Sequence, residues 1–90
     1  MTFYIFQDRY VAVVDELKDN PDPDYWTRER IGQFAGDMLR AMADSIPEQP
    51  GTVAVDQDGW ENIVDLLHRS DTISPASILN RIEKVTGKEG

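Results

Sequence analysis

The sequence predicts a compact all-α domain of about four short amphipathic helices. The chain has 90 residues, enough for a single hydrophobic core. Its composition, 40% hydrophobic and 29% charged, is that of a globular protein. Three breaks rich in Pro, Asp, Ser and Gly, at 20–24, 47–51 and 70–75, separate four segments, most of which have apolar residues at helical spacing. We find no internal repeat and expect residues 1–90 to form one domain.

The first helix is expected over residues 2–19. Its apolar residues recur at helical spacing, Thr2 can cap its amino end, and Pro21 ends it. Ile5 does not fit this pattern, because a helix places it on the polar face. A short strand over residues 3–6 therefore stays open, as part of an α+β alternative.

The second helix, over residues 27–45, is expected to be the central one. Its apolar arc covers more than half of the circumference, which is typical of a helix that packs on two neighbours. Gly32, Gly36 and Ala43 line one shoulder of this arc. A glycine inside a helix costs about 1 kcal/mol relative to alanine, so we expect a close backbone approach here, within the domain or from a partner.

The segment 52–55 is rich in β-branched residues but has no evident partner strand. We interpret it as an extended connector, with a strand as the alternative. A third helix over 58–69 follows, capped by Asp56 or Asp58.

The fourth helix is expected over residues 75–86. It follows Ser74 and has proline at its first helical position, where the missing N–H costs nothing. Gly87 is expected to end it as a C′ glycine.

Charge and composition exclude several classes of function. Asp and Glu outnumber Lys and Arg by 17 to 9, and the net charge of −8 argues against broad electrostatic binding to nucleic acid or anionic membranes. The absence of cysteine and the single histidine exclude disulfides, thiol catalysis and His- or Cys-cluster metal sites. No stretch has the roughly 18 apolar residues of a membrane helix, and no signal peptide is evident, so we expect a soluble, cytoplasmic protein.

Two features resemble parts of functional sites, a calcium-binding loop and a catalytic histidine, but each lacks residues that such a site needs. Aligning Gly59 with the glycine of a calcium loop puts Ala54 at the first ligand position and Asp65, one carbon shorter than the usual glutamate, at the last. We interpret the neighbouring aspartates as helix caps. His68 lies in the last turn of a helix without a nucleophile–base pattern, and it suits the helix dipole there. No metal, no cofactor and no catalytic residue is expected.

Two segments are candidates for binding a partner. The loop after the first helix combines acids, two stiffening prolines and two aromatics, which are residue types that suit protein interfaces. For this loop we favour a connector whose aromatics fold back as a lid over the core; if Trp26 is exposed, the loop is instead the best candidate contact point. The small-residue shoulder of the second helix is the other candidate. The expected partner-binding residues are Asp19, Asp22, Asp24, Tyr25, Trp26, Gly32, Gly36 and Ala43.

The last two helices have the outline of a helix-turn-helix. Residues 68–90 carry a net charge of +1 and residues 1–67 a net charge of −9, so only this end is not repelled by DNA. A charge of +1 is nevertheless far below the basic footprint of a DNA reader. In this alternative the DNA-contacting residues are Ser77, Asn80, Arg81 and Lys84.

The sequence therefore predicts a non-catalytic acidic protein that binds another protein, as an adaptor or inhibitor. The expected partner has a basic surface or is a second copy of the chain; no nucleic acid, membrane or small-molecule substrate is expected. Two alternatives stay open: a DNA-mimicking inhibitor of a nucleic-acid-binding protein, and a small helix-turn-helix regulator. Small acidic domains also occur among accessory proteins of phages and mobile elements, and we keep that class as a hypothesis for this chain.

Overall fold

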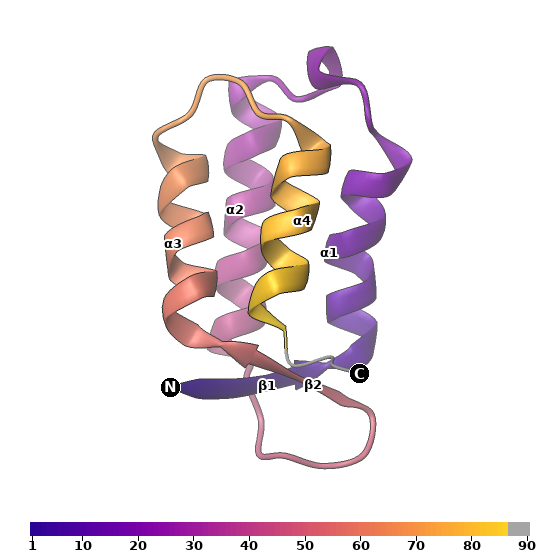
Figure 1. Cartoon of the computed structure of the whole chain (residues 1–90), viewed down its shortest axis with the longest axis vertical. Helices are drawn as coiled ribbons and strands as arrows, with labels where there is room; N and C mark the ends of the chain where they lie inside the picture. The colour runs from indigo at the N-terminus through magenta and orange to yellow at the C-terminus, as the bar shows by residue number, and fades with distance from the viewer. Residues whose placement is uncertain (87–90) are drawn as a thin grey trace.

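Residues 1–86, the part of the chain that the computed structural model describes, form two strands and four α-helices (Figure 1). The helices stand side by side along the long axis of the molecule, and the strands cross one end of them. The elements, in chain order, are β1 (Thr2–Phe6), α1 (Gln7–Asp19), the 3-10 turn η1 (Pro23–Tyr25), α2 (Arg28–Ala43), β2 (Thr52–Asp56), α3 (Gln57–His68) and α4 (Pro75–Val85).

The antiparallel pairing of β1 with β2 confirms the α+β alternative, so the all-α class is only partly right. Phe3 and Ile5 face the core while the residues between and beside them are more exposed, which is the two-residue period of a strand. Helix α1 consequently begins at Gln7 and not at Thr2. The expected connector over 52–55 is β2, whose partner strand lies fifty residues earlier in the chain.

The later helices begin where local signals predict. Thr27 caps α2 and Asp56 caps α3, because their side-chain oxygens accept the backbone N–H three residues on, at 3.3 and 2.9 Å. Helix α4 begins with Pro75, as the preference of proline for the first helical position predicts. The predicted end of this helix at Gly87 lies outside the described residues.

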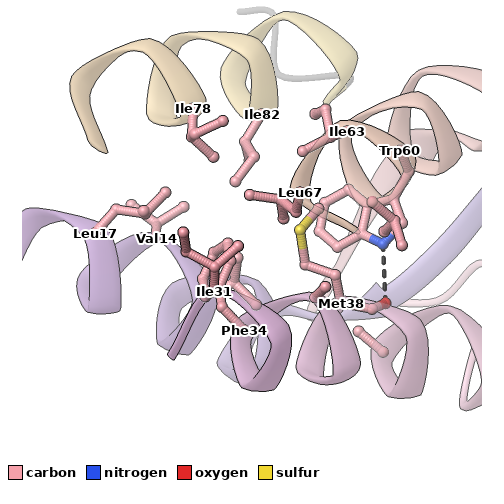
Figure 2. Packing of buried hydrophobic residues seen from close by; sticks show 14 of the residues in the cluster. Val14, Leu17, Ile31, Phe34, Met38, Trp60, Ile63, Leu67, Ile78 and Ile82 are labelled. Carbon is pink, nitrogen blue, oxygen red and sulfur yellow. Dashed lines mark hydrogen bonds between the residues drawn. The ribbon is translucent and has the colours of Figure 1, made fainter. Parts of the chain in front are cut away.

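The core lies between the helices and the inner face of the sheet (Figure 2). Trp60 is the largest fully buried side chain, and its ring stands edge-on to Phe3, with 6.0 Å between the ring centroids. The indole Nε1 of Trp60 donates a hydrogen bond of 2.9 Å to the carbonyl oxygen of Met38. Leaving such a buried donor without a partner costs about 1–3 kcal/mol, so this bond helps to fix how α3 packs on α2.

The structure contains an internal repeat, so the prediction that the chain has none is wrong. Each half of the chain forms a strand, a helix that follows the strand without a connecting residue, and a second helix. The sequences of the two halves also align at a shift of 50 residues over the strand and the first helix. The identical positions are Thr2/Thr52, Gln7/Gln57, Asp8/Asp58, Val14/Val64, Asp15/Asp65 and Leu17/Leu67.

A local two-fold axis through the middle of the sheet relates the two repeats. Tyr4 pairs with Ala54, the residue at the equivalent position of the second repeat. When each residue is replaced by its counterpart 50 positions away, the residue pairs on one side of this central pair become those on the other side. The same patch of each repeat therefore meets its equivalent, as in a symmetric dimer.

Backbone hydrogen bonds and helix packing follow the same symmetry. The N–H of Gln7 donates to the carbonyl of Gly51, and the N–H of Gln57 donates to the carbonyl of Met1, each at 2.8 Å. Helix α1 packs on α4, and α3 packs on α2, so the second helix of each repeat lies against the first helix of the other. The domain is thus two interlocked copies of one strand-helix-helix unit.

Replacing Gly59 by alanine tests how closely α3 and α4 approach each other. An added Cβ at Gly59 would overlap Cγ1 of Val85, so we expect Gly59→Ala to lower the free energy of unfolding by about 1–3 kcal/mol through overpacking. At Gly32 an added Cβ meets no atom of the described chain within 4 Å. Gly32→Ala is therefore expected to raise the free energy of unfolding by about 0.5–1 kcal/mol. Urea unfolding measures both variants, and a Gly59→Ala protein as stable as the wild type contradicts the close approach.

Candidate partner-binding surfaces

The loop between α1 and α2 covers one end of the core, and its tryptophan is not an exposed anchor. Trp26 is 2% exposed, its Nε1 donates to the carbonyl of Asn20 at 2.8 Å, and its ring stands edge-on to Phe34. Tyr25 is half-buried against Trp26, and the guanidinium of Arg30 lies over the Tyr25 ring, 4.3 Å from its centroid. These aromatics form the lid over the core that was the favoured interpretation of this loop.

The acids of this loop lie on the surface beside the lid. Asp19, Asp22 and Asp24 are exposed at the same end of the helix bundle. Oδ1 of Asp22 accepts the backbone N–H of Asp24 at 3.0 Å and caps η1, so one of the three carboxylates has a structural role.

The small-residue shoulder of α2 is open surface. Within residues 1–86, an added Cβ at Gly32 has no neighbour closer than 4 Å, and one at Gly36 meets Nη1 of Arg40 at 3.9 Å. Ala43 is exposed. The close backbone approach that we expected within the domain therefore does not occur at the described part of this shoulder.

The residues expected to contact DNA lie on the surface of α4, where Ser77, Asn80, Arg81 and Lys84 are all exposed. Helix α4 stands alongside α3 (Figure 1), whereas the helices of a helix-turn-helix cross at about 90–120°.

A two-stranded ribbon such as β1–β2 also fits the major groove of DNA. Neutral side chains and one carboxylate form the outer face of this ribbon: Thr2, Tyr4, Phe6, Thr52, Ala54 and Asp56.

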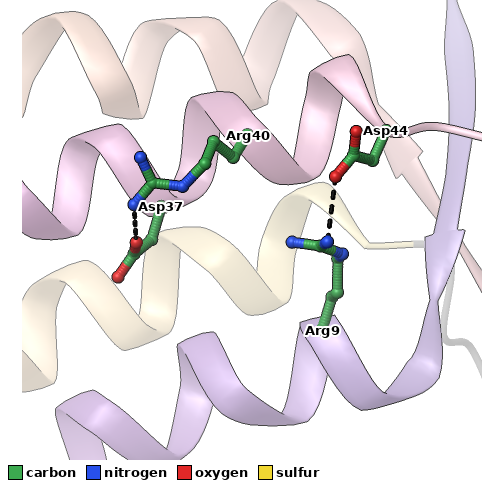
Figure 3. A network of polar contacts seen from close by, with 4 residues as sticks. All are labelled: Arg9, Asp37, Arg40 and Asp44. Carbon is green, nitrogen blue, oxygen red and sulfur yellow. Dashed lines mark hydrogen bonds and ion pairs between the residues drawn. The ribbon is translucent and has the colours of Figure 1, made fainter.

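A groove of about 250 Å³ lies between α1 and α2. Ion pairs mark its rim (Figure 3): Arg9 lies 2.9 Å from Asp44, and Arg40 pairs with Asp37. Because these charges are paired with one another and are solvent-exposed, they contribute little to stability. Glu16 also lines the groove and takes part in no ion pair within residues 1–86. The floor of this groove is formed by Ala12, Val13, Phe34 and Ala41.

A second groove, of about 320 Å³, lies between the start of α1 and β2, and we name it the α1–β2 groove. Its wall is largely apolar, and Val11, at its edge, is 42% exposed. The sequence did not point to this groove, because β2 was expected to be a connector. Its lining residues are Gln7, Tyr10, Val11, Thr52, Val53, Ala54 and Thr86.

The local two-fold axis shows how the α1–β2 groove arises. At the equivalent place, between α3 and β1, the corresponding side chains are larger: Trp60 in place of Tyr10, Phe3 in place of Val53 and Tyr4 in place of Ala54. The counterpart of Val11 is Glu61, an exposed charged residue. The fold therefore does not require an apolar residue at the position of Val11.

Metal-ligating side chains, buried polar groups and apolar helices are the other features that a site or a membrane span would need. Among residues 1–86 no three His, Cys, Asp or Glu side chains gather as a metal site would need, and no polar or charged residue is buried. His68 is exposed in the last turn of α3. No helix of the described residues is long and apolar enough to cross a membrane.

Trp26→Ala tests the lid. Removing this buried indole and its hydrogen bond is expected to lower the free energy of unfolding by about 3–5 kcal/mol. Asp24→Ala changes an exposed neighbour and is expected to stay within about 0.5 kcal/mol of the wild type. Unfolding in urea, followed by circular dichroism, measures both variants. If the two are equally stable, the indole does not act as a lid.

Comparison with protein-family models, with curated proteins and with solved structures found no match. Function therefore has to be inferred from the grooves and side chains of this chain, since a fold by itself does not imply a function.

Proposed function

We propose that this chain is a non-catalytic protein that binds another protein, and that the α1–β2 groove is the centre of its binding surface. The observation that carries this proposal is the difference between the two repeats. In one repeat Trp60 is fully buried beside the strand, while in the other its counterpart, Tyr10, lines a groove of about 320 Å³ and Val11 is exposed beside it. Val11 is continuous with the other apolar residues that line the groove, Tyr10, Val53 and Ala54, and a contiguous apolar patch of this kind marks protein interaction sites.

Charge around the groove indicates the kind of partner. Asp8 lies three residues before Val11 and Asp15 lies four residues after it, so all three share one face of α1. Both carboxylates are exposed, and neither takes part in an ion pair within residues 1–86. An apolar centre with a charged rim is the usual anatomy of a protein interface. A partner for this surface should place an apolar side chain in the groove and basic residues around it.

A DNA-mimicking inhibitor is the second candidate function. The observation that favours it is that two pairs of exposed carboxylates, Asp8/Asp58 and Asp15/Asp65, are repeated by the local two-fold axis. Such a protein would occupy a basic cleft, and its binding would weaken steeply with salt and be displaced by DNA. Binding centred on the groove depends instead on Val11. The helix-turn-helix alternative has the least support, because α4 lies alongside α3 and the chain is strongly acidic.

Affinity capture with three forms of the protein tests the proposal. The wild type, Val11→Arg and Leu39→Arg are each immobilised and exposed to a lysate of the cells that naturally make the protein. We expect at least one protein to bind the wild type and Leu39→Arg but to be reduced about tenfold or more on Val11→Arg, which corresponds to about 1.4 kcal/mol of binding free energy.

Leu39 is the matched control because it is 40% exposed, close to the 42% of Val11, and it lies on α2. Both substitutions are at exposed positions, so melting curves within a few degrees of the wild type are expected for both. Identical sets of captured proteins on all three forms, or none on the wild type, would contradict a binding surface at the groove.

A further inference from the structure

We propose that the α1–β2 groove receives an aromatic side chain carried by a basic segment of the partner protein. This inference rests on the proposed function and adds the chemistry of what enters the groove. At the equivalent place in the second repeat, two aromatic rings of the chain itself pack together. Trp60 is fully buried there, edge-on to Phe3 at 6.0 Å between ring centroids, and its Nε1 donates to the carbonyl of Met38 at 2.9 Å.

The α1–β2 groove has an aromatic counterpart of only one of these rings. A phenol, Tyr10, stands where the indole stands in the other repeat, and Val53 stands where the phenyl ring stands. The resulting space of about 320 Å³ is large enough for a small aromatic group, since ligand sites begin at about 300 Å³. Tyr10 and Gln7 both line the groove, so an aromatic ring and a side chain with an amide oxygen, which can accept an indole N–H, belong to its wall.

The charges beside the groove select a cationic occupant. At a rise of about 1.5 Å per residue, Val11 lies about 4.5 Å from Asp8 and about 6 Å from Asp15 along the axis of α1. Exposed charges act over a Debye length of about 8 Å at physiological ionic strength. A positive charge next to an aromatic group in the groove would therefore be attracted by both carboxylates. The net charge of −8 acts in the same direction at longer range.

Tryptamine, an indole with an ammonium group, is the probe. Titration of the ¹⁵N-labelled full chain, followed by two-dimensional NMR, is expected to shift the amides of Tyr10, Val11, Val53 and Thr86, with a dissociation constant in the millimolar range. Indole-3-acetate carries the same ring with a negative charge and is expected to bind at least threefold more weakly. The difference between the two compounds should shrink as salt is added. Shifts spread elsewhere, or no shift with tryptamine at the millimolar concentrations used, overturn the proposal.

A variant that fills the groove provides the matched control. Tyr10→Trp combined with Val53→Phe copies the residues of the filled site, and we expect it to lose tryptamine binding and to melt at a higher temperature than the wild type. Val53→Phe alone is the smaller change, to be used if the double variant does not fold, and is expected to weaken binding at least threefold. Unchanged affinity in a folded groove-filled variant overturns the proposal.

Two other occupants would also overturn it. If the groove amides shift with protein concentration and sedimentation shows dimers, a second copy of the chain is the occupant. If a chain ending at Thr86 binds tryptamine about tenfold more tightly than the full chain, residues 87–90 are the occupant. If tryptamine does not bind but Val11→Arg still loses the captured partner, the partner binds at the groove as proposed. In that case its aromatic, basic character is contradicted.

Discussion

The pairing of β1 with β2 is the interaction on which the rest of the structure depends. The first N–H groups of a helix have no partner within the helix. Here the first N–H of α1 and the first N–H of α3 each donate to a carbonyl next to the opposite strand, at 2.8 Å. The sheet therefore satisfies these donors and fixes where both helices begin. Because α2 and α4 pack onto the first helix of the opposite repeat, the core is built jointly by the two repeats.

Those parts of the fold that have local causes could be predicted from the sequence. The starts of α2, α3 and α4 are set by Thr27, Asp56 and Pro75, each of which acts within one helical turn. A few consecutive residues are therefore enough to predict where each of these helices begins. The strands have a long-range cause, because each finds its partner fifty residues away. Apolar residues in the first segment also happen to recur at helical spacing; Phe6 belongs to that pattern yet is 48% exposed on the strand. Ile5, the residue that did not fit the helix, was the one local sign of β1.

The candidate site was less predictable than the fold. A loop with two aromatics and several acids has the composition of both an interface and a lid, and only the burial of Trp26 distinguishes the two. The α1–β2 groove is visible only when the repeats are compared, because Val11 is unremarkable until it is set against Glu61. The identical positions of the repeats are few and scattered, which hid the repeat in the sequence. The signal that could have revealed it is the dipeptide Gln-Asp, which directly follows both β-prone segments.

The separation of the two strands along the chain also sets the order in which the protein can fold during synthesis. At about 5–20 residues per second, β1 is made about 3–10 s before β2. During this interval α1 and α2 can form, since their hydrogen bonds are local. The backbone N–H and C=O groups of β1, however, do not yet have a partner strand. Bringing the strands together closes a loop of some fifty residues, whose entropic cost rises only slowly with length. The first repeat therefore reaches its final structure only when the second repeat has been synthesised, even though the two share one plan.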